Sequence, residues 1–320
     1  MTINETANWL QNHDHYLILT HRRPDGDTLG CGAALAGSFW DAGKTAFILK
    51  NPETTERYLP FVEKYWAPDG FEPDRIITVD TASAELFPIN GERYTGRVSL
   101  SIDHHPSNTG YAALDCLAAD RASCGEVVYD ILLEMYGAVS PEAAAALYVA
   151  LSTDTGCFSF ANTTANTLRV ASCLADAGAP IRDLNRDLFR KKARGRILIE
   201  GMVISGLEFY LDGAVAVSSI TNDMMLKAGA TENDMDDIAA IPGGIDGVLV
   251  GVTIREMSGP RDCKVSIRTA PSVDANAIAA RFDGGGHAMA SGFSTDQTIG
   301  ETKRLLLAAL PDFLPPDEAE

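Results

Sequence analysis

The N-terminal third of the chain contains four short apolar runs, each long enough for one buried strand, and helix-like segments separate them. The runs are YLILTH, TAFILK, RIITVD and RVSLSIDHH, which begin at residues 16, 45, 75 and 97. Buried strands that alternate with helices are typical of a parallel sheet, because each parallel connection has to cross over the sheet. We therefore predict an α/β fold with a mostly parallel sheet and helices on both of its faces.

The pattern changes after about residue 180. A polar, charged, helix-like stretch comes first, and hairpin signals follow it. Asp212-Gly213 lies between two strand-like runs, as a tight turn requires, and VLVGVTIREM with KVSIRT gives a second hairpin. We predict a first domain at 1–181, a helical connector at 182–205 and a smaller mixed α/β domain at 206–320, whose tail LPPDEAE should fray.

Net charge limits the partners of the chain. At −18, it argues against the broad basic surface of a protein that binds long duplex nucleic acid. Positive charge is concentrated in RKKARGR, which is more simply a solvated helix face, and in a looser C-terminal set of Arg255, Arg261, Lys264, Arg268 and Arg281. No apolar run is long enough for a membrane helix, and the scattering of the six cysteines does not indicate a disulfide framework. We therefore expect a cytoplasmic protein.

Acidic and imidazole side chains gather where the predicted strands end. They are His21, Asp25 and Asp27 after the first run, Asp80 at the end of the third, and Asp103, His104 and His105 at the end of the fourth. The carboxyl ends of parallel strands meet at one edge of a sheet, so these groups should converge. Asp154, in LSTDTGCFSF after an apolar helix, is expected at the same edge.

So many carboxylates repel one another unless cations lie among them. The aspartates and histidines together could hold two divalent ions about 3.5 to 4 Å apart, with shared carboxylates as bridges. A mixed nitrogen and oxygen ligand set favours Mn²⁺, with Mg²⁺ as the alternative. Any one of these aspartates is as well explained by a helix cap or a turn, so the prediction depends on their repetition at successive strand ends.

The same stretches resemble a known family. HRRPDGDTLG, VDTAS, SIDHHPSN and STDTG are similar, in order and spacing, to the four motifs of the DHH phosphoesterase superfamily. DGGGHAMASG resembles the glycine-rich signature of its C-terminal DHH-associated domain. The resemblance covers nearly the whole chain, and its layout is most similar to the NrnA group of nanoRNases and phosphatases of 3'-phosphoadenosine 5'-phosphate (pAp). It implies a catalytic, metal-binding domain at 1–181 and a substrate-binding domain at 206–320.

The resemblance also implies roles for individual residues. The metal ligands would be His21 and Asp25 for one ion, Asp27 and His104 for the other, and Asp80 and Asp154 for both. His105 would face the scissile phosphate or the leaving group, and Asp103 would orient the neighbouring histidines. The substrate-binding residues would be Arg268, Gly284, Gly285, Gly286 and His287, the glycines through free main-chain N–H groups. Cys31 and Asp283 depart from the family pattern, which usually has serine and glycine there.

The implied activity is hydrolysis by a hydroxide that two metal ions activate. Its substrates would be short RNA or DNA oligonucleotides and dinucleotides, or pAp, which a clamp between two domains would limit in length. No membrane partner is expected, and a homodimer is common in such relatives. Four alternatives stay open: a cyclic dinucleotide phosphodiesterase, a family II inorganic pyrophosphatase, a RecJ-like processive exonuclease and a non-catalytic nucleotide-binding protein. The pyrophosphatase would lack GGGH, and the exonuclease would carry further domains.

Overall fold

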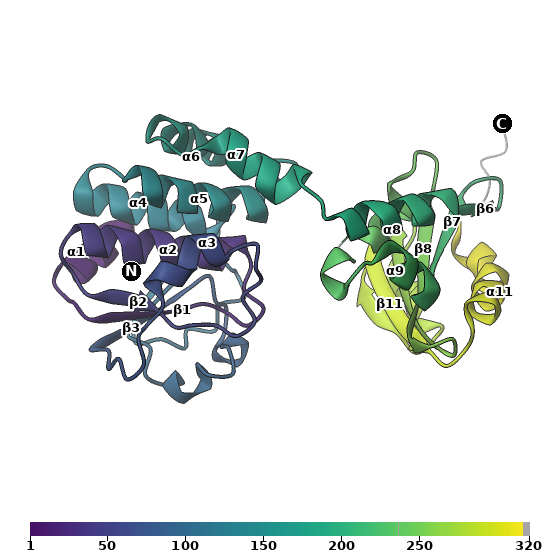
Figure 1. Ribbon diagram of the computed structural model, residues 1–320, viewed down its shortest axis with the longest axis horizontal. Helices are drawn as coiled ribbons and strands as arrows, with labels where there is room; N and C mark the ends of the chain where they lie inside the picture. The colour runs from purple at the N-terminus through teal and green to yellow at the C-terminus, as the bar shows by residue number, and fades with distance from the viewer. Residues whose placement is uncertain (236, 316–320) are drawn as a thin grey trace. The chain divides into compact units, whose positions relative to one another are not determined.

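The computed structural model describes residues 1–235 and 237–315. The chain divides into two compact units, Met1–Lys191 and Lys192–Glu320 (Figure 1). The boundary lies within the predicted connector, residues 182–205, and most of the predicted frayed tail is outside the described residues. Among the residues that the structure describes, no helix is long and apolar enough to cross a membrane.

The first unit contains a parallel five-stranded sheet, as predicted. Its strands are β1 (Tyr16–Leu19), β2 (Ala46–Ile48), β3 (Arg75–Val79), β4 (Leu100–Asp103) and β5 (Asp115–Leu117), in the order β2-β1-β3-β4-β5. Ile18 pairs with Ile48 on one side and Ile77 on the other. Strands β1 to β4 are short and almost entirely buried, which is why the four apolar runs predicted them.

Helices cover the two faces of this sheet unequally. The helices of the main core lie on one side of the sheet (Figure 1): α1 (Ile3–Gln11), α2 (Gly26–Asp41), α3 (Leu59–Val62), α4 (Cys124–Tyr136), α5 (Pro141–Asp154) and α6 (Ala165–Asp176). Of these, α6 packs on α4 and α5. A smaller core on the other face contains Phe87, Tyr94 and Val98. Short 3₁₀ helices, η2 (Ala84–Leu86) and η3 (Glu92–Tyr94), and loops supply that cover.

Two glycines allow α2 to lie close to α5. A Cβ atom at Gly26 would lie 2.3 Å from the Thr153 hydroxyl oxygen, and one at Gly30 would lie 2.4 Å from the carbonyl oxygen of Ala146. Both distances are far shorter than a van der Waals contact, so only glycine fits at this crossing. The glycines of HRRPDGDTLG therefore bring α5, which ends at Asp154, against the helix that carries Asp27.

The beginning of α4 does not use the capping box that its sequence would allow. Ser123 and Glu126 fit a capping box, but the Ser123 side chain makes no capping hydrogen bond. Glu126 is buried and instead accepts hydrogen bonds of 2.6 Å from both Thr167 and Asn166 on α6. Tertiary contacts with α6 hold the glutamate away from the helix end, so the capping box does not form.

The predicted connector is helical. It contains α7 (Ile181–Asn185), a π-helical turn (Arg186–Arg190) and α8 (Arg194–Ser205). Within the basic stretch RKKARGR, Lys192 and Arg196 pair with Glu200 at 2.8 and 3.1 Å. Part of its positive charge is therefore neutralised within the chain, in keeping with a solvated helix face.

The second unit is a smaller mixed α/β domain, as predicted. Its strands are β6 (Glu208–Tyr210), β7 (Val215–Ile220), β8 (Val250–Gly259), β9 (Asp262–Thr269), β10 (Gly285–His287) and β11 (Ala290–Thr295), in the order β10-β11-β9-β8-β7-β6. Both predicted hairpins form, β6–β7 through Asp212 and Gly213 with positive φ, and β8–β9. Further helices are α9 (Asn222–Ala228), α10 (Ala275–Ala280) and α11 (Ile299–Ala309).

Candidate active site

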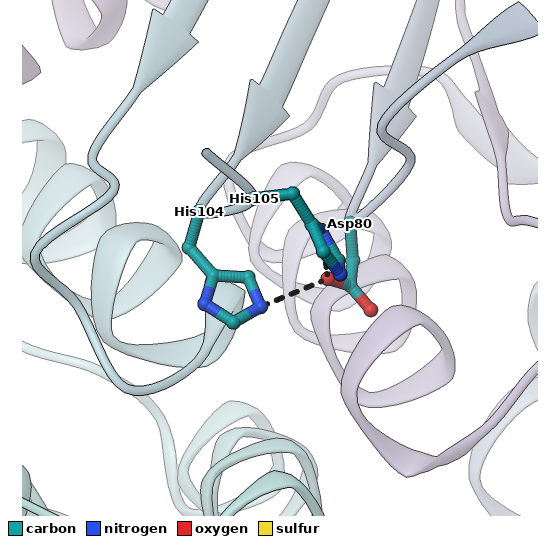
Figure 2. A group of neighbouring side chains, drawn as sticks. All are labelled: Asp80, His104 and His105. Carbon is teal, nitrogen blue, oxygen red and sulfur yellow. Dashed lines mark ion pairs between the residues drawn. The ribbon is translucent and has the colours of Figure 1, made fainter. Parts of the chain in front are cut away.

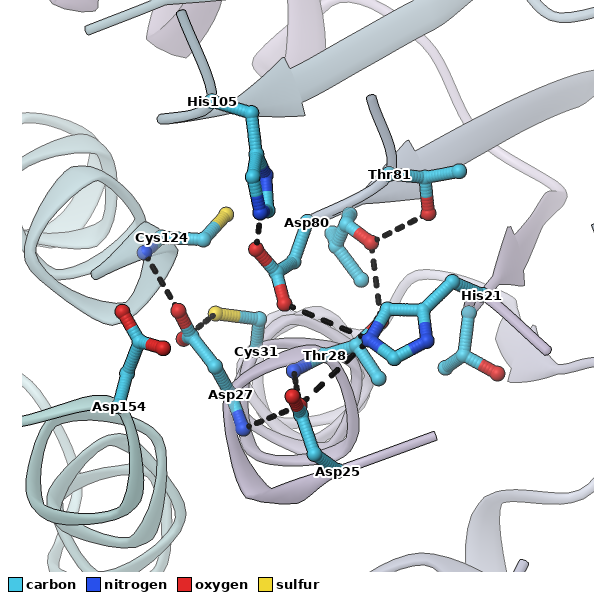
Figure 3. A network of polar contacts seen from close by, with 12 residues as sticks. His21, Asp25, Asp27, Thr28, Cys31, Asp80, Thr81, His105, Cys124 and Asp154 are labelled. Atoms are coloured by element: carbon cyan, nitrogen blue, oxygen red, sulfur yellow. Dashed lines mark hydrogen bonds and ion pairs between the residues drawn. The ribbon is translucent and has the colours of Figure 1, made fainter. Parts of the chain in front are cut away.

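The acidic and imidazole side chains predicted from the strand ends do converge in the first unit (Figure 3). Within each of three groups, the potential ligand atoms lie within 4.8 Å of one another. The groups are His21, Asp25 and Asp80; Asp27, His104 and Asp154; and Asp80, His104 and His105. All six predicted metal ligands are therefore in the cluster, together with His105.

Asp80 belongs to two of these groups, and His104 joins them to the third. Oδ2 of Asp80 lies 3.7 Å from Nε2 of His21 (Figure 3), and its Oδ1 lies 3.4 Å from Nε2 of His104 (Figure 2). Asp80 is almost fully buried, and its Oδ1 accepts no hydrogen bond from the residues that the structure describes. A buried carboxylate oxygen without a donor is costly. Nδ1 of His105 also lies 3.5 Å from Oδ1. The two carboxylate oxygens thus face different histidines, Oδ2 facing His21 and Oδ1 facing His104 and His105, which suits a carboxylate shared by two cations.

The backbone of Asp80 explains this orientation. Directly after β3, Asp80 adopts the left-handed conformation with φ of 53°. Few residues other than glycine adopt it, aspartate among the more tolerant, and such strain is concentrated at functional sites. The sharp turn directs the side chain across the sheet edge.

Both histidines present the nitrogen that a metal ligand needs. Nδ1 of His21 lies 2.8 Å from the carbonyl oxygen of Arg22, and Nδ1 of His104 lies 3.1 Å from that of Arg121. A carbonyl oxygen only accepts, so each Nδ1 carries a proton and each neutral ring keeps its lone pair on Nε2. Since both Nε2 atoms face carboxylates, the donor set fits divalent cations.

Asp27 is fixed by groups that the sequence analysis missed. Its buried carboxylate accepts hydrogen bonds from the main-chain N–H of Cys124 at 2.7 Å and of Gly125 at 2.9 Å. Asp27 therefore caps α4 in place of Ser123. The Cys31 thiol also donates to it at 3.3 Å, so this departure from the family pattern still supplies a donor. No local signal predicts contacts so distant in sequence.

Asp25 and Asp154 reach the cluster from helix ends. Asp25 is the N-cap of α2 and accepts hydrogen bonds from the N–H groups of Asp27 and Thr28, while Nε2 of His21 lies 3.6 Å from its Oδ1. Asp154 is the last residue of α5, and its Oδ2 lies 3.6 Å from Nε2 of His104. Asp154 groups with Asp27 and His104, and its sharing between two ions stays a prediction.

Asp103 has the contacts expected of an orienting residue. It is fully buried at the end of β4 and accepts hydrogen bonds from Nδ1 of His105 at 2.8 Å and from the N–H of His104 at 2.8 Å. Nδ2 of Asn108 donates to its other oxygen at 2.7 Å. Asn108, within SIDHHPSN, is a further supporting residue that the sequence analysis did not single out.

The electrostatics of the cluster reflect an excess of negative charge. Burial, with Asp80 and Asp154 nearby, raises the pKa of Asp27 well above its usual value, and burial raises the pKa of Asp154 to about 6. Burial alone would lower the histidine pKa values, but the carboxylates around His21 and His104 raise both to about 10. Without metal the site therefore retains protons, which divalent cations would replace.

In the second unit, a hollow contains three of the predicted substrate-binding residues. Arg268 of β9 lines it together with Gly285 and Gly286 of the edge strand β10. Arg268 donates from Nη1 to the carbonyl oxygen of its neighbour Ile267. His287 ends the same edge strand and is exposed, but it does not line this hollow.

The prediction that the N–H of Gly284 is free is wrong. This N–H donates to the carbonyl oxygen of Ala279 at 3.0 Å, so it is not free to bind a phosphate as predicted. A Cβ atom at Gly284 would lie 2.4 Å from the carbonyl oxygen of Gly292. Glycine is required there because the backbone between α10 and β10 approaches β11 closely.

Comparisons with known proteins agree with this arrangement. The model of the DHH family N-terminal domain matches residues 15–151, and that of the DHHA1 domain matches 212–314. A Thermus thermophilus protein named bifunctional oligoribonuclease and PAP phosphatase NrnA is 34% identical over 277 residues, which cover 86% of this chain and 82% of the relative. A Bacillus subtilis protein of the same name is 28% identical, over 88% and 90%.

Solved structures share the fold. An exopolyphosphatase-related protein from Bacteroides fragilis superposes with a TM-score of 0.80 at 23% identity, over 97% of this chain and 95% of that one. An exonuclease RecJ bound to manganese superposes with a TM-score of 0.56 at 16% identity, over 98% and 95%. The two domain matches and the identity to the Thermus relative show that this chain belongs to the DHH family with a C-terminal DHHA1 domain, among the relatives named NrnA.

Proposed function

We propose that this protein is a divalent-metal-dependent phosphoesterase that hydrolyses short oligonucleotides and dinucleotides to mononucleotides, and pAp to AMP. The observation that carries the proposal is the buried Asp80 carboxylate, whose two oxygens face His21 and His104 at 3.7 and 3.4 Å. The substrate class is taken from the relatives named oligoribonuclease and PAP phosphatase. Since those substrates are intracellular, we also propose a cytoplasmic location.

The proposed ligands are His21 and Asp25 for one ion, Asp27 and His104 for the other, and Asp80 and Asp154 for both. Nitrogen and oxygen donors in this ratio favour Mn²⁺ over Mg²⁺. Two such ions would polarise the phosphoryl oxygens and acidify the attacking water. The DHH-type domain at 1–181 would hold this chemistry, the connector would be 182–205, and the domain at 206–320 would bind substrate.

His105 is the proposed proton donor. Its side chain is 41% exposed, and the hydrogen bond from Nδ1 to Asp103 fixes the ring so that Nε2 is left for substrate. That hydrogen bond is also the main reason why the pKa of His105 is raised. A protonated His105 could donate to the scissile phosphate or to the leaving oxygen, and Asp103 would act as its positioning residue.

In the second domain, Arg268, Gly285, Gly286 and His287 are the proposed substrate-binding residues. Arg268 supplies a charged donor, and the glycines let a phosphate approach the exposed edge strand. Gly284 would contribute by shaping this strand.

A substrate panel tests the proposal. Purified protein with Mn²⁺ should release AMP from pAp and mononucleotides from a 5'-phosphorylated dinucleotide, but leave a 24-mer RNA largely intact, and a chelator should stop both reactions. Asp80→Asn should abolish turnover, whereas the exposed control Asp69→Asn should not. Preferential turnover of pyrophosphate, cyclic di-AMP or long single strands, or nucleotide binding without turnover, would contradict the proposal in favour of the corresponding alternative.

A further inference from the structure

The sheet face of the second unit that lies opposite its main core carries polar side chains beyond the predicted phosphate-binding hollow. Along β9, Cys263, Val265 and Ile267 are buried in the core. Side chains alternate between the faces of a strand, so the residues between them, Lys264, Ser266 and Arg268, all point to the opposite face.

The neighbouring strands extend this polar row. Lys264 is in register with Ser294 of β11 on one side and with Arg255 of β8 on the other. The three residues therefore lie side by side across the sheet. Arg255 and Lys264 are two of the basic residues that the sequence analysis noted and that the proposed function does not use.

Two hollows meet at this row. One, of about 420 Å³, contains Arg268, Gly285 and Gly286. The other, of about 540 Å³, contains Arg255, Met225 and Met257, and the carboxylates of Glu232 and Asp262 also line it. Lys264 and Ser294 line both, so the hollows adjoin along the sheet. Each volume is typical of a small-molecule site.

The basic side chains that line the two adjoining hollows are only partly paired with carboxylates. In the described parts of the chain, neither Lys264 nor Arg268 forms an ion pair with a carboxylate, although acids outnumber bases by 44 to 26. Arg255 pairs with Glu232 through Nη2, but its Nε is buried and has no hydrogen-bond acceptor there. Lys264 is exposed, so its ammonium is available to a ligand beside the flexible apolar side chains of Met225 and Met257, which could pack against a base.

The spacing of Lys264 and Arg268 indicates the length of the ligand that would bind. Lys264 and Arg268 are four residues apart on one strand, or about 13 Å at roughly 3.3 Å per residue. That distance exceeds one nucleotide repeat, so a phosphate at Lys264 belongs to a nucleotide beyond the one held at Arg268.

We propose that Lys264 and Arg255 form a second phosphate subsite, which binds the backbone of single-stranded oligonucleotides longer than a dinucleotide. The inference rests on the proposed function and makes it more specific: the subsite improves binding of longer substrates, and pAp does not reach it.

Steady-state kinetics on a pentanucleotide and on pAp test the subsite. In Lys264→Ala, KM for the pentanucleotide should rise about 5-fold or more and its salt dependence should weaken by about one phosphate contact, while KM for pAp should change less than 2-fold. Lys264→Gln should show the same changes in KM and in salt dependence. Lys227→Ala is the matched control, because Lys227 pairs with Asp223 and lines neither hollow.

The outcomes separate the two proposals. If wild-type protein hydrolyses neither substrate, the proposed function fails and the subsite with it. If it hydrolyses both, but Lys264→Ala leaves both KM values unchanged or raises them equally, the subsite is refuted and the proposed function stands.

Discussion

The main-chain N–H of Cys124 donates a 2.7 Å hydrogen bond to the carboxylate of Asp27, 97 residues earlier in the chain. A proposed metal ligand on α2 is thereby also the cap of α4. The positive end of a helix favours a negative charge, and this contact opposes the cost of burying Asp27 among other acids. Folding of the core and assembly of the site are therefore coupled through one side chain.

Asp27→Ala should destabilise the protein even without metal. The substitution leaves the buried N–H groups of Cys124 and Gly125 without an acceptor, so chelator-treated protein should lose about 2 to 4 kcal/mol of unfolding free energy. Asp154→Ala is the matched control, because His104 at 3.6 Å is the ion-pair partner of that carboxylate and, among the residues that the structure describes, no buried N–H depends on it. Urea unfolding of both variants measures the difference, and equal losses would argue against the capping role.

Gly30→Ala should separate α2 from α5. The added methyl group would overlap the carbonyl oxygen of Ala146, which should cost about 1 to 3 kcal/mol and weaken metal binding by displacing Asp154. Gly32→Ala tests the same exchange on the same helix, where the nearest atom, in Ile48, is 3.4 Å away. Thermal unfolding and metal titration should show losses for the first variant alone; similar behaviour of the two would refute the close-packing argument.

The metal-free protein should lose stability as pH rises. His21 and His104 have folded-state pKa values of about 10 against an ordinary 6.5, so their contribution is complete below pH 6.5 and disappears as pH rises through 10. Bound metal would take the place of these protons, so its affinity should increase over the same range. Unfolding with and without Mn²⁺ between pH 6.5 and about 9 measures both trends. A metal-free protein whose stability rises with pH there would contradict this account of the charges.

Asp103→Asn should impair turnover without removing the metals. The variant loses the charged acceptor for Nδ1 of His105, and supporting residues of this kind typically contribute about 10- to 100-fold. Because Asp103 raises the pKa of His105, the alkaline limb of the pH profile of kcat/KM should move to lower pH. Metal content and the profile should be measured together, with Asp69→Asn as control. An unshifted alkaline limb would exclude His105 as the proton donor.

The sequence predicts this fold where burial is continuous and fails where partners are distant. The runs that became β1 to β4 were recognisable because nearly all of their residues are buried. β5 is only three residues, Asp115–Leu117, and exists through its pairing with β4. The uneven helix cover of the first sheet likewise depends on long-range packing.

The same distinction applies to the residues of the candidate active site. Asp80 could be predicted as a ligand from its place after a strand, but not its left-handed backbone, which depends on the surrounding packing. Motif residues such as His104 and His105 were recognisable, whereas the capping of α4 by Asp27 joins segments that no local pattern connects. The N–H of Gly284 was predicted to be free, and only the structure shows that Ala279 accepts from it.

The most direct test of the central claim is the number of divalent ions that the chain binds. Calorimetric titration of Mn²⁺ into chelator-treated protein should show two ions per chain, with pAp turnover reaching its maximum only when the second has bound. Asp80→Asn should weaken both binding steps, because the Asp80 oxygens face His21 and His104 separately. Full turnover with a single bound ion, or wild-type binding by the Asp80 variant, would contradict the two-ion site.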